Sequence, residues 1–311
     1  MIFWDEKRYY SLDYFLKHKY GEKIYKISLN CNMGCPNRDG TVGTGGCIFC
    51  SSGGSGDFAG PDTVSVSAQI EHAVCRIQSS QTGKYAGTKY IAYFQAYTNT
   101  YAPISYLRQV FMEAIMYPFI VGLSISTRPD CLEDEVLVLL EELNRIKPVW
   151  VELGLQTSHE ITAAFIRRGY PRSVFEEAVL KLSQRKIDTI VHVILGLPNE
   201  TKEDMLRTIQ YIGSFPVQGI KLQLLHVLKG TDLAKHIDDF HILTMDEYVD
   251  LVICSLELLP ENIVIHRLTG DGPKDLLLAP LWSQRKHKVL NTIHQQMKIR
   301  ETWQGRLYSQ P

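Results

Sequence analysis

Residues 24–50 read IYKISLNCNMGCPNRDGTVGTGGCIFC and contain Cys31, Cys35, Cys47 and Cys50, four of the seven cysteines in the chain. The first seven residues alternate apolar and polar side chains, as in a strand with one buried face. The remainder is rich in glycine, so its backbone can wrap tightly around a bound object. Two chemistries fit the cysteines. Four thiolates could form a tetrahedral zinc site, or three could hold a [4Fe–4S] cluster with one iron open to a ligand. The spacing alone does not decide between them.

Five further segments resemble this first strand, and helical patterns lie between them, for example at 132–145 and 202–212. The six predicted strands are 24–30, 89–95, 120–126, 149–156, 187–195 and 218–225. Strands that alternate with helices predict a parallel sheet with right-handed crossovers.

One face of each predicted strand is polar, which is unusual for a parallel sheet covered on both sides. In 149–156, for example, Val151, Leu153 and Leu155 alternate with Glu152. A polar interior is costly unless its groups are paired or line a ligand cavity. We therefore predict an α/β fold in which a curved or partial barrel encloses a binding site, with the chemistry at the carboxyl ends of the strands. An ordinary doubly wound sheet with polar strand ends is the alternative. The position of the cysteine segment at the mouth of such a barrel favours the iron–sulfur cluster over a structural zinc site.

The composition is that of an ordinary globular protein, with 311 residues, 45% hydrophobic and 22% charged. No apolar run approaches the ~18 residues of a membrane span. The first residues lack the apolar core of a signal peptide, so we expect a cytoplasmic protein. In that compartment clustered cysteines indicate metal binding or redox chemistry. The scattered Cys75, Cys131 and Cys254 are most simply buried apolar residues.

Charge is distributed unevenly although the net charge is only −1. Residues 266–300 contain seven Lys or Arg and two Asp, and residues 131–160 contain seven acids and two bases. A basic segment can attract phosphate locally. A solvated helix face explains the same charges equally well.

The sequence resembles the radical SAM superfamily, and within it a branch with a CPNRDG…GGC-x-FC loop. That branch is related to the catalytic subunit of elongator and to oxygen-independent coproporphyrinogen oxidase. The resemblance covers nearly the whole chain. Outside the loop it rests on RYYSLDYFLKHKYGEKIYKI (8–27), SGGSGDFAG (52–60), YFQAYTNTYAP (93–103), STRPD (126–130), VELGLQT (151–157), RRGY (167–170), GLPNE (196–200) and HRLTGDGPKDLLLAPLW (266–282).

The resemblance implies a partial (β/α)6 TIM-type barrel of the radical SAM type. It also implies that Cys35, Cys47 and Cys50, which form its C-x11-C-x2-C pattern, are the catalytic cluster ligands and that Cys31 is not. The open iron would chelate S-adenosylmethionine (SAM). One electron, from a donor such as flavodoxin or ferredoxin, would then cleave SAM to methionine and a 5′-deoxyadenosyl radical.

The resemblance further implies a set of SAM contacts, each with a simpler structural alternative. Phe49 is expected near adenine, or else packs within its loop. Gln95, Thr98 and Asn99 are expected near the amino group, or else form a turn. Gln156 and Arg168 are expected to contact SAM, although Arg168 could form a surface salt bridge and Arg167 is adjacent. His192 is expected to make a further polar contact, or else is a satisfied core histidine.

For the substrate, the resemblance implies the wobble uridine of tRNA, whose 5-carboxymethylaminomethyl group would be trimmed to aminomethyl. The basic segment, with Trp282 and Trp303, is compatible with an RNA partner. There are two alternative interpretations: a radical SAM enzyme that acts on a small molecule, and a non-enzymatic zinc-binding module. The predicted domains are an N-terminal arm (1–23), the barrel (24–230) and a mainly helical C-terminal extension (231–311) that covers the substrate.

Overall fold

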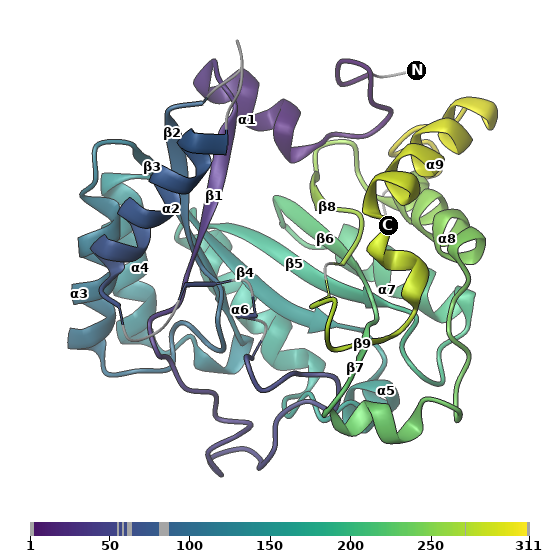
Figure 1. The fold of residues 1–311 in the computed structure, drawn as a ribbon, viewed down its shortest axis with the longest axis horizontal. Helices are drawn as coiled ribbons and strands as arrows, with labels where there is room; N and C mark the ends of the chain where they lie inside the picture. Colours follow the sequence, from purple (N-terminus) through teal and green to yellow (C-terminus); the bar gives the residue numbers. More distant parts are fainter. Residues whose placement is uncertain are drawn as a thin grey trace.

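The sheet contains seven parallel strands in the order β1-β2-β3-β4-β5-β6-β8 (Figure 1). The structure is a computed structural model that describes residues 3–54, 56–57, 59–60, 64–80, 87–270 and 272–309. Ser55, Phe58 and Asp271, which belong to two of the segments quoted above, lie outside these residues. The strands are β1 (Ile24–Leu29), β2 (Lys89–Phe94), β3 (Ile120–Thr127), β4 (Val149–Gln156), β5 (Asp188–Leu195), β6 (Gly219–Leu224) and β8 (Val264–Arg267). The six predicted strands are confirmed to within one residue at each end.

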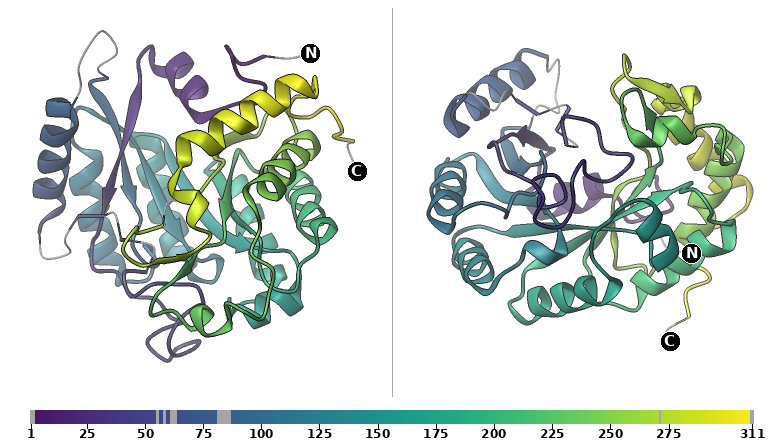
Figure 2. Two further views of the ribbon diagram at one scale, coloured as in Figure 1. Left: turned by 45° about the vertical axis from the view of Figure 1, so that its right-hand side comes forward. Right: turned by 90° about the horizontal axis from the view of Figure 1, so that it is seen from below.

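Helices cover the outer face of the curved sheet (Figure 2). Two of them begin with a capping box, in which Thr201 pairs with Asp204 and Thr244 pairs with Glu247. No helix in the described part of the chain is long and apolar enough to cross a membrane. The helices are α1 (Leu12–Tyr20), α2 (Val66–Ser80), α3 (Ile104–Ile115), α4 (Asp134–Ile146), α5 (Glu160–Phe165), α6 (Arg172–Gln184), α7 (Lys202–Gly213), α8 (Met245–Leu258) and α9 (Lys286–Ile299), with short 3-10 turns η1 (Pro129–Cys131), η2 (Asp232–His236) and η3 (Leu281–Gln284).

The main hydrophobic core lies between the sheet and these helices. In β4, Val151, Leu153 and Leu155 are fully buried in this core, and the apolar residues of the other strands join them. The opposite face of the sheet is concave and encloses the polar side chains. The predicted partial barrel is therefore confirmed, with the polar faces of its strands directed inward.

A seventh strand extends the sheet beyond the six that the sequence predicted. β8 lies in the segment that we expected to be mainly helical, and it pairs in parallel with β6 through Gly219↔Val264 and Ile220↔Ile265. With four residues, β8 is too short to show a periodic pattern. It follows α8 in the chain, so β6, α8 and β8 form one more parallel strand–helix–strand unit.

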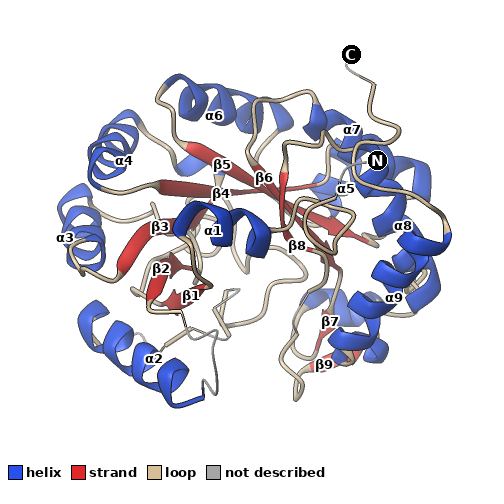
Figure 3. Cartoon of the chain, turned by 90° about the horizontal axis from the view of Figure 1, so that it is seen from above, coloured by secondary structure: helices blue, strands red, loops and turns tan. Residues whose placement is uncertain are grey.

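The N-terminal arm closes the end of the barrel opposite the cysteines. α1 lies across this end and contacts both β1 and β8 (Figure 3). Leu16 of α1 is buried in a small apolar cluster with Trp150 and Ile190, from the beginnings of β4 and β5. The backbone N–H of Ile265 in β8 donates to the Tyr10 carbonyl at 2.7 Å. The barrel interior is thus sealed at its amino end and opens at its carboxyl end.

Candidate active site

The cysteine loop, residues 30–50, lies across the carboxyl ends of the strands (Figure 2, right). Ile48 is held from two sides, because its N–H donates to the Ile166 carbonyl at 3.2 Å and its carbonyl accepts from the Leu233 N–H at 2.8 Å. The Asn37 side chain donates to the Arg167 carbonyl at 2.6 Å. The loop is therefore anchored to segments that follow β4 and the short strand β7 (Val227–Leu228), on the other side of the barrel mouth.

Cys35, Cys47 and Cys50 of this loop line a single pocket. The Cys50 N–H donates to the Cys47 carbonyl at 3.0 Å, which forms a tight turn between these two residues. Burial raises the pKa of Cys47 to about 12, and it also raises the pKa of Cys50, although the nearby Arg38 guanidinium opposes that shift. None of the seven cysteines forms a disulfide. Cys47 and Cys50 therefore need a cationic partner to offset the cost of burying a thiolate charge.

Cys31 is in a different environment from the other three cysteines of the loop. It is 5% exposed and packs within the main hydrophobic core, and burial raises its pKa to about 12. The hydroxyl of Tyr106 donates to its carbonyl at 2.9 Å. Cys31 does not line the pocket that the other three cysteines share.

Gly54 lies in the segment that follows the loop and packs closely against Tyr97. Its replacement tests whether this close packing is needed. The φ of Gly54 is +55°, and an added Cβ would lie 2.2 Å from the Tyr97 ring. The Tyr97 N–H donates to the Gly54 carbonyl at 2.7 Å, so the two backbones cannot simply separate. We expect Gly54→Ala to lower the free energy of unfolding by about 1–3 kcal/mol and to reduce iron incorporation, measured by metal analysis.

Gly45→Ala is the matched control for this prediction. Gly45 also has a positive φ, +86°, but no atom lies within 4 Å of an added Cβ. Gly45→Ala therefore introduces backbone strain without a steric clash. Equal iron loss in the two variants would show that contact with Tyr97 is irrelevant.

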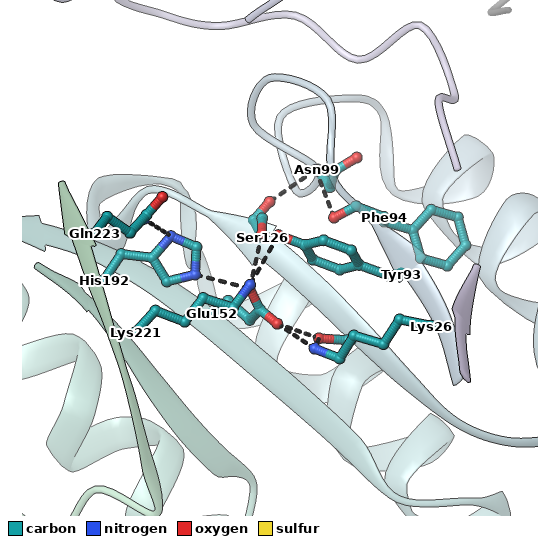
Figure 4. A network of polar contacts seen from close by, with 10 residues as sticks. Lys26, Tyr93, Phe94, Asn99, Ser126, Glu152, His192, Lys221 and Gln223 are labelled. Atoms are coloured by element: carbon teal, nitrogen blue, oxygen red, sulfur yellow. Dashed lines mark hydrogen bonds and ion pairs between the residues drawn. The ribbon is translucent and has the colours of Figure 1, made fainter. Parts of the chain in front are cut away.

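Glu152, in the middle of β4, is the centre of a buried polar network inside the barrel (Figure 4). Its carboxylate lies 2.7 Å from Lys26 Nζ and 2.7 Å from His192 Nε2, and it forms an ion pair with Lys221. The Ser124 hydroxyl donates to it at 2.5 Å. Residues from four other strands thus converge on one carboxylate of β4.

Further polar groups surround this centre on the side of the pocket. The Tyr93 hydroxyl lies 2.9 Å from Ser126 Oγ and accepts from Lys221 Nζ at 3.1 Å. The Gln223 amide lies 3.3 Å from Nδ1 of His192. The polar lining predicted from strand alternation is therefore a connected network.

Burial and the charges of neighbouring groups determine the pKa values of the residues in this network. Burial alone would raise the pKa of Glu152, but Lys221, Lys26 and His192 hold it well below its usual value. Burial and the neighbouring Lys221 lower the pKa of His192 to about 4, so its ring is neutral at pH 7. Burial lowers the pKa of Lys221 to about 7 even though Glu152 opposes the shift.

The pocket extends from the cysteine loop into this network, since Glu152, Lys221 and Tyr93 line it together with the three cysteines. A second pocket adjoins it and extends toward His226, which precedes the short strand β7 (Val227–Leu228). β7 pairs with β9 (Leu277–Ala279) in a separate antiparallel sheet. The two pockets share Phe49, Cys50, Gln95, Gln156, His192, Gln223 and Arg267.

Gln156 lies where the two pockets meet, at the end of β4. Its φ is +63°, and the pairing of β4 with β5 is irregular between Gly154 and Gln156. Its amide packs over Gly154, where an added Cβ would lie 2.7 Å from Nε2. Its Oε1 is buried and has no hydrogen-bond partner among the described residues. A strained residue with an unsatisfied buried acceptor at a pocket wall is a good candidate for a ligand contact.

Arg168 lines the pocket, but most of its hydrogen-bonding capacity is used within the protein. It is 1% exposed, and its guanidinium donates to the carbonyls of Leu155, Thr157 and Tyr170 at 2.7–3.1 Å. It also pairs with Glu160 at 3.2 Å. The structure thus gives Arg168 a positioning role: it fixes the backbone on both sides of Gln156. The ion pair of Arg168 with Glu160 is therefore buried on the arginine side, whereas its neighbour Arg167 is half-exposed and forms a surface ion pair with Asp232.

The remaining predicted contacts fall into two groups. Phe49, Gln95 and Thr98 line the pocket, as does His192. Asn99 is fully buried behind the pocket wall, where its amide donates to the carbonyls of Phe94 at 3.0 Å and Ser126 at 2.8 Å. It therefore joins the ends of β2 and β3 and is absent from the described pocket lining.

Several residues that lie at the site were not predicted from the sequence. Lys221, Tyr93 and Arg267 face the interior from β6, β2 and β8, and Arg38 reaches the pocket from the loop. The Arg38 guanidinium donates to the carbonyl of Ser51 at 2.5 Å. For the strand residues, the sequence offered one signal: they occupy positions that alternate with the core-facing residues of each strand and therefore face the interior.

Family models match the chain in two consecutive parts. The model described as Radical SAM superfamily matches residues 25–212, and the Radical_SAM C-terminal domain matches residues 217–299. Among curated proteins, the chain is 44% identical over 305 residues to the uncharacterized protein YtqA of Bacillus subtilis (strain 168). This match covers 97% of this chain and 94% of that protein.

Two further matches are more distant. The chain is 24% identical over 164 residues to a tRNA uridine(34) acetyltransferase of Methanocaldococcus jannaschii, which covers 51% of this chain and 30% of that protein. The solved structure of Methanocaldococcus infernus Elp3 with an N-terminal deletion superposes with a TM-score of 0.70 at 14% identity. That match covers 91% of this chain and 64% of the Elp3 chain, and it shows a common fold.

Proposed function

Because the chain belongs to the radical SAM superfamily, we propose that it is a tRNA-modifying enzyme that acts on the 5-substituent of the wobble uridine. Its cofactors are those of the superfamily, a [4Fe–4S] cluster and SAM. In the proposed reaction a 5-carboxymethylaminomethyl group is trimmed to aminomethyl. The observation that carries an active site at this position is the single pocket that joins three loop cysteines to a polar barrel interior.

The chemistry of the loop supports Cys35, Cys47 and Cys50 as the cluster ligands. All three line the pocket, and burial raises the pKa of Cys47 and Cys50, so these thiols need a cationic partner such as iron to ionise. In the described residues no group of three His, Cys, Asp or Glu is arranged to hold a single metal ion. A cluster requires wider spacing, because each thiolate binds a different iron. Cys31, in the hydrophobic core, is not needed for this ligand set.

When bound, the cluster and SAM supply a carbon-centred radical that abstracts hydrogen from the substrate. The residues of this chain bind and orient the cofactor and the substrate, and they exclude water from the site. Gln156 offers an unsatisfied buried Oε1 toward a ligand, and Arg168 fixes the backbone around it. Neutral His192 is held by Glu152 at the pocket wall. Reduction of the cluster requires an electron donor, for which flavodoxin or ferredoxin is suitable.

Two features support tRNA as the substrate. One is the similarity to a protein named as a tRNA uridine(34) acetyltransferase. The other is the exposed basic residues of the C-terminal segment, Lys274, Arg285, Lys288 and Lys298. Arg300 does not count among these, since it pairs with Asp250 at 2.6 Å. Trp282 packs against Tyr248 and donates to the Leu243 carbonyl at 2.9 Å, so it supports the protein fold rather than base stacking.

Analysis of tRNA nucleosides tests the proposed substrate. Cells that lack the protein are expected to accumulate 5-carboxymethylaminomethyluridine derivatives at the wobble position and to lose the aminomethyl product, as measured by mass spectrometry of digested tRNA. The purified enzyme should convert one to the other with SAM and a reductant. Unaltered wobble nucleosides in those cells would contradict this function and favour a radical SAM enzyme for a small molecule.

Salt dependence tests the basic segment separately. If it neutralises phosphates, each contact contributes about 0.7–0.9 to the slope of log affinity for tRNA against log salt. Charge reversal at Arg285 and Lys288 is then expected to reduce the slope and to leave SAM cleavage without tRNA unchanged. Lys23→Glu, an exposed lysine at the closed end of the barrel, is the control. An unchanged slope in the double variant would exclude these contacts.

A further inference from the structure

We propose that Asn37 and Arg38 raise the reduction potential of the iron–sulfur cluster by acting on its ligands. Asn37 does so through a hydrogen bond to Cys47, and Arg38 through its positive charge. This inference rests on the cluster ligands of the proposed function and is independent of the tRNA substrate. It goes further because it gives a role to two residues of the CPNRDG motif that the proposed function does not use. The reduction potential of such a cluster depends on hydrogen bonds to its sulfurs and on charge.

The Asn37 side chain contacts the sulfur of Cys47 directly. It is 4% exposed, and its Nδ2 lies 2.6 Å from the Arg167 carbonyl oxygen and 3.5 Å from Cys47 Sγ. A carbonyl oxygen can only accept a hydrogen bond, so the amide nitrogen and not the amide oxygen must face Arg167. That nitrogen has two N–H groups. One donates to the carbonyl, and the other is therefore directed at the sulfur.

Two glycines leave room for the Asn37 amide. An added Cβ at Gly43 would lie 2.6 Å from Asn37 Oδ1, and one at Gly169 would lie 3.2 Å from the same atom. The Asn37 carbonyl accepts from the Gly46 N–H at 2.7 Å. The loop thus encloses the side chain and holds the backbone of Asn37, so the direction of its N–H toward the sulfur is set before a cluster binds.

The Arg38 guanidinium places a positive charge beside Cys50, in the pocket that the three cysteines share. Its Nη2 donates to the Ser51 carbonyl at 2.5 Å and to the Cys50 carbonyl at 3.4 Å. The group also lies over the Tyr97 ring, 5.5 Å from its centroid. These partners are neutral, so they hold the guanidinium in place without cancelling its charge.

The direction of the effect follows from the charge that reduction adds. A reduced cluster has one more negative charge than an oxidised one, and burial makes that charge costly. A hydrogen bond to a ligand sulfur and a nearby positive charge both become more favourable as negative charge increases. Asn37 and Arg38 therefore stabilise the reduced form more than the oxidised form. A weaker electron donor, such as flavodoxin, is then sufficient to reduce the cluster.

Asn37→Leu and Arg38→Met test the inference, because each retains most of the side-chain volume and removes the donor or the charge. The reduction potential of the cluster-loaded protein, without SAM or tRNA, is measured by anaerobic redox titration followed by electron paramagnetic resonance. We expect each variant to lower the equilibrium constant for reduction by roughly 10-fold, which is a potential lower by about 59 mV for a one-electron couple. Arg38→Lys retains the charge and should lie between Arg38→Met and the parent.

Two reductants distinguish this role from a structural one. SAM cleavage driven by flavodoxin, measured as release of 5′-deoxyadenosine, should be slower in Asn37→Leu and Arg38→Met than in the parent. Titanium(III) citrate is a much stronger reductant, and with it the rates of both variants should return to that of the parent. Loss of a merely structural contact would lower the rate with both reductants and leave the potential unchanged.

The matched controls are Asn144→Leu and Arg167→Met. The Asn144 amide also donates to a carbonyl of another segment, that of Lys186 at 3.0 Å, but Asn144 is absent from the described pocket lining. Arg167 is next to the loop and half-exposed, and its charge is paired with that of Asp232. Both control variants should keep the potential of the parent.

The remaining outcomes separate this inference from the proposed function. If Asn37→Leu does not retain iron, Asn37→Ser, which lacks the amide but remains polar, takes its place. Iron loss in both Asn37 variants would give Asn37 a structural role and refute its part of the inference. Parental potentials in the iron-loaded Asn37 and Arg38 variants would refute the inference and leave the proposed function standing. Retention of iron by Cys47→Ala would instead contradict the proposed ligands, and the role of Asn37 would fail with them.

Discussion

Single alanine replacements of Cys35, Cys47 and Cys50 will each remove most of the iron and abolish SAM cleavage, whereas Cys31→Ala will preserve both. The first three cysteines line one pocket at the barrel mouth, and Cys31 packs in the hydrophobic core. A cluster that loses one of three protein ligands exposes a second iron and is no longer held. Iron content, visible absorbance and release of 5′-deoxyadenosine from SAM measure the effect.

Cys131→Ala is the matched control for Cys31→Ala, because Cys131 is also buried, at 7% exposure, and lies outside the pocket lining. Both variants should lose some stability from the deleted thiol and retain iron. Loss of iron in Cys31→Ala but not in Cys131→Ala would make Cys31 a ligand. Stoichiometric zinc that depends on all four loop cysteines would instead favour the zinc-binding reading.

The fold could be predicted from the sequence because one periodic signal determines both faces of the sheet. In β4 the residues Val151, Leu153 and Leu155 pack under the helices, and Glu152 faces the interior, as their alternation requires. A parallel strand with one polar face needs a closed polar interior, so the same pattern also predicted the barrel. β8 was missed because four residues contain too little of the pattern.

The site was less predictable because its contacts depend on curvature. Glu152 meets Lys26 from β1 and Lys221 from β6, two strands that lie far apart in the order of the sheet. Only a strongly curved sheet brings them together, and the sequence does not specify the degree of curvature. The cysteine loop, in contrast, is local in sequence, and its position after the first strand was sufficient to place it at the mouth.

Arg168→Met is expected to lower the free energy of unfolding by about 3–5 kcal/mol, an effect typical of breaking a buried charged network. The replacement removes the guanidinium donor from the carbonyls of Leu155, Thr157 and Tyr170, of which Leu155 still accepts from the Thr157 N–H at 2.8 Å. Each buried acceptor that loses its partner costs about 1–3 kcal/mol, less where water enters. Denaturant unfolding of the cluster-loaded protein measures the change.

Arg167→Met is the control that the chain itself provides at the adjacent position. Arg167 is half-exposed, and its pair with Asp232 is a surface ion pair, so its loss should leave stability close to that of the parent. SAM affinity separates the two roles considered for Arg168. If Arg168 acts by fixing the backbone around Gln156, SAM affinity and stability fall together, and Arg168→Lys recovers part of both. If Arg168→Met is as stable as the parent but binds SAM poorly, the guanidinium contacts SAM directly, and the positioning role is wrong.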